Sequence, residues 1–97
     1  MRVVVKEPNK TGTIEQVTNE LETFNNLVGG YIECLNIKDN LILICNEEGK
    51  LMDLEPNLYF NGDTVVGTVV FVEFNRDGDF VGLSDNSIEY LKSMTII

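Results

Sequence analysis

The sequence predicts a single α+β domain covering residues 1–97, in which a mainly antiparallel sheet carries two helices packed on one face. Two observations predict this class. Short runs rich in β-branched and aromatic residues alternate with turn residues along most of the chain. Two other segments repeat apolar residues every three or four positions, which is the helical period. The chain has 97 residues, of which 43% are hydrophobic, and this suffices for one domain with a buried core.

Four strands are expected in the first half of the chain. Met1–Lys6 holds three consecutive valines and ends before Pro8, and Thr13–Val17 is expected to be a short edge strand. Tyr31–Ile37 and Leu41–Cys45 are separated by a tight polar connector, so we expect them to form an antiparallel hairpin. Leu41–Cys45 has no polar alternation, which predicts a central strand covered on both faces.

The first helix is expected to begin after Thr18 or Asn19 and to end at Gly29-Gly30. Asn19, followed three residues later by Glu22, fits a capping box, in which two side chains satisfy the first amides of a helix. Glycine ends a helix because it adopts the left-handed conformation without a Cβ clash. Four apolar residues at helical spacing define the inward face: Leu21, Phe24, Leu27 and Val28.

The second half of the chain predicts a further hairpin. Thr64–Phe74 is the longest β run, and Gly67 within it predicts a bulge or a close backbone approach. Asn75–Asp79 contains an Asp-Gly turn dipeptide, and Phe80–Leu83 then returns as the partner strand.

A second helix is expected near the end of the chain. Its capping residue is Ser84 or Asp85, because short polar side chains accept hydrogen bonds from the first helical amides. Its inward residues are Ile88, Leu91 and Met94.

The charge balance restricts the kinds of partner. Sixteen acidic and seven basic residues give a formal net charge of −9 at pH 7. Proteins that bind nucleic acid directly rely on lysine and arginine to contact phosphates, so direct nucleic-acid binding is not expected. An acidic surface is compatible with a basic protein partner, and equally with a simple role in solubility.

Hydrophobic runs and cysteines bear on where the protein works. No apolar run approaches the ~20 residues that span a membrane, and the apolar part of the first segment is too short for a signal peptide. We therefore expect no membrane association and a cytoplasmic location. Cys34 and Cys45 lie in apolar β runs, where two buried free thiols are expected in preference to a disulfide.

The residue types that carry most enzymatic chemistry are scarce. The sequence has no histidine, which is the most frequent general base and the usual partner of serine and cysteine nucleophiles. We therefore expect no catalytic residue, and neither a metal nor a cofactor. Asn75, Asp77 and Asp79 have the spacing that opens a calcium-binding loop, but Phe80 stands where that loop requires glycine, so a plain hairpin is favoured.

A polar cluster after Leu41–Cys45 is the candidate site. One hypothesis is a partner-binding face of carboxylates, formed by Glu47, Glu48, Asp53, Glu55 and Asp63. The alternative is a ligand pocket formed by side-chain amides, an ammonium group and glycine amides, namely Asn46, Lys50, Asn57, Gly29 and Gly30, with Lys6 and Arg2 adding positive charge. A structural role competes with both, since Asn46 suits an Asx turn and Asn57 suits bonding to loop backbone.

Several motifs occur together at a characteristic spacing. They are Leu27-Val28-Gly29-Gly30-Tyr31-Ile32-Glu33, Cys45-Asn46-Glu47-Glu48-Gly49-Lys50-Leu51, Leu54-x-Pro56-Asn57 and Val66-Gly67-Thr68-Val69-Val70. Through them nearly the whole chain resembles a family of short uncharacterised proteins found in phages, plasmids and conjugative elements of Gram-positive bacteria. The resemblance carries over no catalytic residue, and it implies an accessory protein of a mobile genetic element.

The resemblance also implies a class of function. Small acidic proteins of mobile elements are often inhibitors of host defence, such as anti-CRISPR or anti-restriction proteins. We therefore expect binding and inhibition of a host protein with a basic surface, a defence nuclease being one candidate. Two alternatives stay open: a small-molecule or nucleotide sponge, and a structural module that assembles with itself, for example as a homodimer, through an edge strand such as Thr13–Val17.

Overall fold

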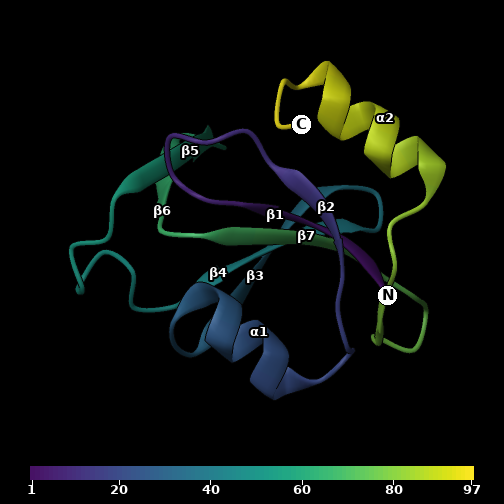
Figure 1. Cartoon of the computed structure of the whole chain (residues 1–97), viewed down its shortest axis with the longest axis horizontal. Coiled ribbons are helices and arrows are strands. Elements are labelled where there is room, and N and C mark those ends of the chain that lie inside the picture. The colour runs from purple at the N-terminus through teal and green to yellow at the C-terminus, as the bar shows by residue number, and fades with distance from the viewer.

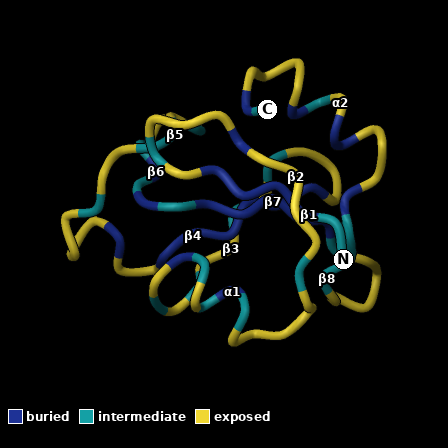
Figure 2. Tube along the Cα trace, in the orientation of Figure 1, coloured by how far each residue is buried: buried dark blue, intermediate teal, exposed yellow.

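Two buried strands form the centre of the structure. In the computed structural model, which describes residues 1–97, β4 (Leu41–Asn46) pairs antiparallel with β7 (Val69–Phe74), and Leu43 lies opposite Phe71. Every residue of β4 is buried, and only the last residue of β7 is partly exposed (Figure 2). Because successive side chains of a strand point to opposite faces, such burial requires a cover on each face. The prediction of a central strand at Leu41–Cys45 is confirmed.

The other strands extend this centre on both sides. The main sheet has the order β2-β1-β7-β4-β3, β8 pairs with β7 beside this path, and every strand pair is antiparallel. The bounds are β1 (Arg2–Lys6), β2 (Thr13–Gln16), β3 (Ile32–Lys38) and β8 (Phe80–Val81). The predicted hairpin of β3 and β4 and the predicted edge position of β2 are confirmed.

The two helices lie on opposite faces of the sheet. Helix α1 (Leu21–Val28) buries Phe24 and Val28 against one face, whereas α2 (Asp85–Ser93) packs on the other (Figure 1). The α+β class with a mainly antiparallel sheet is confirmed, but the prediction that both helices pack on one face is wrong. The physical reason is that β4 and β7 are apolar at nearly every position, so one face would otherwise expose a row of valines and isoleucines.

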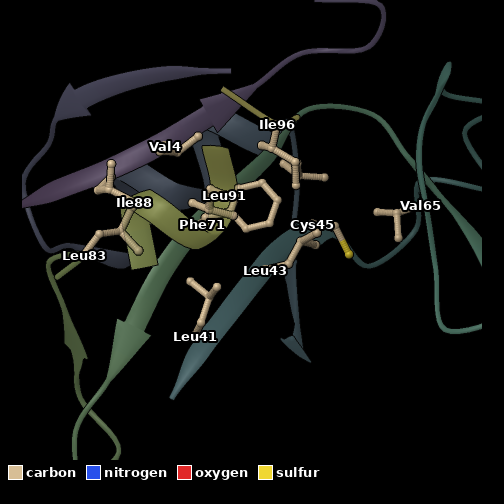
Figure 3. Close-up of a cluster of buried hydrophobic side chains, with 11 residues drawn as sticks. Val4, Leu41, Leu43, Cys45, Val65, Phe71, Leu83, Ile88, Leu91 and Ile96 are labelled. Carbon is tan, nitrogen blue, oxygen red and sulfur yellow. The ribbon is translucent and has the colours of Figure 1, made fainter. Parts of the chain in front are cut away.

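The core is accordingly divided between the two faces. On the α2 side, side chains from the sheet, the helix and the C-terminal segment gather in one cluster (Figure 3), formed by Val4, Leu41, Leu43, Cys45, Val65, Val69, Phe71, Leu83, Ile88, Leu91 and Ile96. On the α1 side the cluster consists of Val3, Val5, Phe24, Val28, Ile42, Ile44, Val70 and Val72. Alternate residues of each central strand thus enter different clusters.

The ends of α1 depart from the expected capping. The residue before the helix is Glu20, which makes no side-chain capping bond, and Asn19 instead donates to the carbonyl of Phe80 over 2.9 Å. The predicted capping box is therefore wrong, because Asn19 is occupied in joining the helix to β8. Leu21, expected on the inward face, is 62% exposed. Gly29 has a φ of 81° and ends the helix as predicted.

Helix α2 begins as predicted. Ser84 caps it, because its hydroxyl accepts a hydrogen bond from the amide of Ser87 over 3.2 Å. Ile88 and Leu91 are buried, whereas Met94, the third residue expected to point inward, is 56% exposed just beyond the helix.

Two further sequence predictions concern local structure. Cys34 is exposed and Cys45 is buried, and both thiols are free, so the prediction of two buried thiols is wrong for Cys34. The reason is that β3 is an edge strand with little cover over its outer part. The hairpin prediction at Asn75 is confirmed, because its side-chain oxygen accepts from the amides of Asp77 and Asp79, each over 3.0 Å.

Gly67 divides the longest β run into two strands. The first part, β6 (Asp63–Val66), pairs with β5 (Pro56–Phe60) in a separate two-stranded sheet, and the second part is β7. Gly67 has a φ of 77°, and a Cβ at this position would lie 2.7 Å from Cδ1 of Leu54. The predicted close backbone approach is confirmed, because the amide of Gly67 donates to the carbonyl of Glu55 over 2.7 Å. In addition, no larger residue fits beneath the side chain of Leu54 without a shift.

The energetic cost of a side chain at Gly67 can be measured by comparing alanine substitutions at two glycines. Gly62 has a similar φ of 81°, but a Cβ at Gly62 would meet no atom within 4 Å, so Gly62→Ala introduces backbone strain alone, about 1 kcal/mol. We expect Gly67→Ala to lower the free energy of unfolding by about 1 kcal/mol more, because Leu54 must also move. Urea unfolding of both variants measures the difference, and equal losses would show that Leu54 yields freely.

Candidate functional site

The segment between β4 and β5 forms a structured acidic loop, Glu47–Glu55. It carries four carboxylates, at Glu47, Glu48, Asp53 and Glu55, and a single lysine, Lys50. All five residues are exposed. Because the loop leaves the end of the most buried strand, its base is fixed to the core while its acidic residues stay in solvent.

Asn46 positions the start of this loop. Its side-chain oxygen accepts a hydrogen bond from the amide of Glu48 over 2.8 Å, which closes an Asx turn. Its side-chain nitrogen donates to the carbonyl of Val28 over 3.1 Å, at the end of α1. Asn46 is only 6% exposed, so its side-chain amide has lost its hydrogen bonds to water. The two hydrogen bonds within the chain replace them. The proposed structural role of Asn46 is therefore confirmed.

Further hydrogen bonds hold the loop in one shape. The amide of Met52 donates to the carbonyl of Glu48 over 2.9 Å, and that of Leu54 donates to the carbonyl of Gly49 over 3.0 Å. Gly49 is buried against Val66 of β6, where a Cβ would approach the Val66 side chain to 2.8 Å. The acidic loop is thus folded onto β6 and presents a defined surface.

An ion pair fastens the same loop to the small sheet. The Lys50 ammonium lies 2.6 and 2.7 Å from the two carboxylate oxygens of Asp63. Hydrogen bonding by Lys50, followed by the bond from the Thr64 amide, lowers the pKa of the Asp63 carboxyl below its ordinary value. Asp63 is therefore engaged within the chain, whereas the four carboxylates of the acidic loop have no ion-pair partner.

Large apolar side chains lie exposed among these carboxylates. Leu51 is 86% exposed and Met52 51% exposed, both in the acidic loop, and Tyr31, which precedes β3, is 72% exposed. Tyr31 and Met52 line the same hollow beside the end of α1. Apolar side chains inside a charged rim are the usual anatomy of a protein-binding surface. Sequence reasoning missed these three residues, although Leu51 and Met52 stand out as apolar residues within a charged turn.

A groove is lined jointly by the acidic loop, β3, the end of β4 and β6. Its volume is about 230 Å³, and three carboxylates and one ammonium line it: Glu33, Glu47, Asp63 and Lys50. Leu35, Cys45 and Val65 form apolar parts of the wall. We call it the acidic groove, because its ionised side chains carry a surplus of negative charge. Glu33 is a second residue that the sequence did not single out, because only the fold brings β3 beside the loop.

The residues of the alternative ligand pocket are brought together only in part, since Asn46, Gly29 and Gly30 line the hollow beside α1, whereas Lys50 and Asn57 do not. Gly29 and Gly30 line the hollow beside α1, where both amides donate to the carbonyl of Asn25, over 2.8 and 3.0 Å. Lys50 lines the acidic groove instead. Only Asn46 borders both recesses. The glycine amides are thus satisfied within the chain and have no free hydrogen for a ligand.

Asn57 and the positive side chains serve other contacts. Asn57 donates to the carbonyls of Lys6 and Gly67 over 2.9 and 2.8 Å, and it accepts from the Lys6 ammonium over 2.7 Å. Its predicted structural role, bonding to loop backbone, is confirmed. Arg2 donates to the carbonyl of Leu83 and pairs with Asp85 at 3.0 Å. Arg2, Lys6 and Lys50 therefore form no common positive patch.

The two thiols are poorly suited to nucleophilic chemistry. Burial, together with the charge of Glu33, raises the pKa of the Cys45 thiol to about 11, and the same two causes raise the pKa of Cys34. Because the thiolate is the reactive form, these raised pKa values disfavour nucleophilic reaction at both residues. The acidic loop therefore offers a structured, negatively charged surface with exposed apolar side chains.

Comparisons with known proteins place the chain in a family. Neither helix has the length and the apolar character that crossing a membrane requires. No curated protein and no solved structure matches the sequence. The family described as Domain of unknown function (DUF3846) matches residues 1–96, which is nearly the whole length. The chain therefore belongs to the DUF3846 family.

Proposed function

We propose that this protein acts by binding another protein through the acidic loop, and that the bound protein offers a basic surface. The observation that carries the proposal is the exposure of Leu51 and Met52 within a loop of four unpaired carboxylates. Apolar anchors supply affinity when they are desolvated, and the surrounding charges speed the approach of a partner of opposite sign. The loop is held by hydrogen bonds, so little ordering entropy is lost on binding.

The partner is, in this proposal, a host protein that the binding inhibits. The support is the resemblance to small proteins of phages, plasmids and conjugative elements, many of which counter host defence. A CRISPR or restriction nuclease has a basic channel for nucleic acid, which suits a surface of net negative charge. The protein would then work in the bacterial cytoplasm, without an enzymatic activity of its own and without binding nucleic acid directly.

Charge reversal on the acidic loop tests this function. We expect Glu47→Lys with Glu48→Lys to weaken capture of the partner about tenfold, because two attractive contacts become repulsive. The measurement is a pull-down from a Gram-positive host lysate with the immobilised protein, quantified by mass spectrometry. Wild-type capture should also fall when the salt concentration is raised, because surface charges are screened.

A matched control is available at the other end of the sheet. Asp77→Lys with Asp79→Lys makes the same change of charge on the exposed turn after β7, away from the acidic loop (Figure 1). This control should capture the partner as the wild type does. Capture that is equally reduced in both double variants would reflect net charge alone, and capture unchanged by the loop variant would refute the proposed surface.

A further inference from the structure

Strand β3 has a free edge. It is bonded to β4 alone and ends the sheet on that side. The amide of Glu47 donates to the carbonyl of Tyr31 over 2.8 Å, which marks Tyr31 as facing β4. Backbone groups alternate along an antiparallel strand, so those of Ile32, Cys34 and Asn36 point away from the sheet. A row of unsatisfied donors and acceptors is a template for another strand.

The opposite edge of the sheet is a weaker template. Strand β2 has four residues, all exposed, and it lines neither the acidic groove nor the hollow beside α1. Strand β3 has seven residues, and its side chains on the α2 face border two recesses. The longer edge with shaped neighbours is the better candidate for recognising a particular sequence.

The two recesses differ in chemistry. Glu33 and Leu35 border the acidic groove. Four residues after Glu33, Ile37 borders a cavity of about 130 Å³ between β5, α2 and the sheet, and all ten of its lining residues are hydrophobic. Tyr59 and Met94 border the same cavity and are 77% and 56% exposed, so it is accessible from the surface. One edge thus carries a negative recess and an apolar recess at a fixed spacing.

We propose that β3 binds an extended segment of the partner protein as an added antiparallel strand, with a basic side chain at the acidic groove and an apolar side chain in the apolar cavity. This inference rests on the proposed function and specifies the partner's chemistry. Main-chain hydrogen bonds to the free edge supply affinity, and the two recesses supply sequence preference.

The geometry sets the motif that would be recognised. Glu33 and Ile37 are four residues apart on one strand, which is at most about 13 Å, because the register of β3 against β4 shifts between Asn36 and Lys38. An antiparallel partner therefore carries its apolar residue four positions before its basic residue. Lys38 reinforces this order, because its ammonium, 4.8 Å from the ring centre of Tyr90, repels a basic side chain at the apolar end.

A designed peptide provides the probe. It consists of alternating threonine and valine, with phenylalanine four positions before arginine, and a second peptide has the two residues exchanged. We expect the first peptide to shift the amide NMR signals of β3 in the isotopically labelled protein, and the exchanged peptide to bind about fivefold more weakly. Shifts confined to β2, or no binding by the first peptide, would overturn the inference.

A charge swap separates recognition from any effect on folding. Glu33→Lys should weaken binding of the arginine peptide about fivefold and should strengthen binding of a peptide with glutamate in place of arginine. Glu15→Lys, on the exposed strand β2, is the matched control and should change neither. A variant that merely misfolds would lose both peptides, whereas unchanged preference would refute the role of Glu33.

The outcomes distinguish this inference from the proposed function. Capture of the host protein that depends on the acidic loop but not on Glu33 would refute the added strand and leave the proposed function standing. Peptide binding at β3 without any captured protein that depends on Glu47 and Glu48 would refute the proposed function instead. A dimer in sedimentation, with β3 as its interface, would show that the edge is taken by a second copy and would overturn the inference.

Discussion

Replacing Phe71 by alanine is expected to lower the free energy of unfolding by about 3–5 kcal/mol. The ring is 1% exposed, lies in the cluster beneath α2, and already borders the apolar cavity of about 130 Å³. Its removal would extend an existing void, which the rigid pair of central strands cannot close by moving inward. Since a domain of this size is stable by about 5–15 kcal/mol, Phe71→Ala should leave little stability.

Urea unfolding followed by circular dichroism measures this loss. Tyr59→Ala is the control, because Tyr59 is 77% exposed on β5 and its truncation should change stability by less than about 0.5 kcal/mol. A small loss of unfolding free energy for Phe71→Ala would mean that α2 moves toward the sheet and fills the space left by the ring. The apolar cavity that the partner segment needs would then also be adaptable.

Replacing Glu73 by glutamine is expected to cost about 2 kcal/mol at neutral pH. Glu73 is 6% exposed on β7, and its carboxylate accepts from the amide of Ser84 over 2.6 Å and from the side chain of Asn40 over 3.0 Å. Burial alone would raise its pKa, but these bonds, with those of the Ser87 and Ser84 hydroxyls, outweigh it and lower the pKa. The carboxylate thus joins the start of α2 to the central sheet.

The sign of the pH dependence follows from this lowered pKa. A carboxylate with a depressed pKa stabilises the fold fully above its unfolded pKa of about 4.3, and the contribution is lost as the pH falls through the folded pKa. The difference between wild type and Glu73→Gln should therefore shrink on acidification below about pH 5. Glu89→Gln, exposed on α2, is the control and should change stability by less than about 0.5 kcal/mol at neutral pH. A constant difference would exclude ionisation of Glu73 as the cause.

Much of the fold was predictable because local patterns decide it. Three elements follow from residues that are close together in the sequence. They are β1 with its valines, β4 with its unbroken apolar run, and α1 with the glycine at its end. The side of the sheet on which each helix packs is not a local property, and its prediction was wrong. The signal was nevertheless present, since a strand buried on both faces needs a cover on both.

The candidate site was predictable only in part. The charged turn after Leu41–Cys45 is visible in the sequence, and its glutamates are exposed as a turn requires. The contributions of Glu33 and Ile37 arise from the pairing of β3 with β4 and from the docking of β5 and α2. Asn57 likewise contacts Lys6, 51 positions away, which no local pattern encodes.

The place of β1 in the sheet bears on how the protein is made. β1 is the first strand in the sequence, but it lies between β2 and β7, and Val4 is opposite Phe71. A nascent chain can form the β1–β2 and β3–β4 hairpins early, yet isolated hairpins are only marginally stable in water. The sheet closes only once β7 has been synthesised, because β7 joins the β1–β2 hairpin to the β3–β4 hairpin.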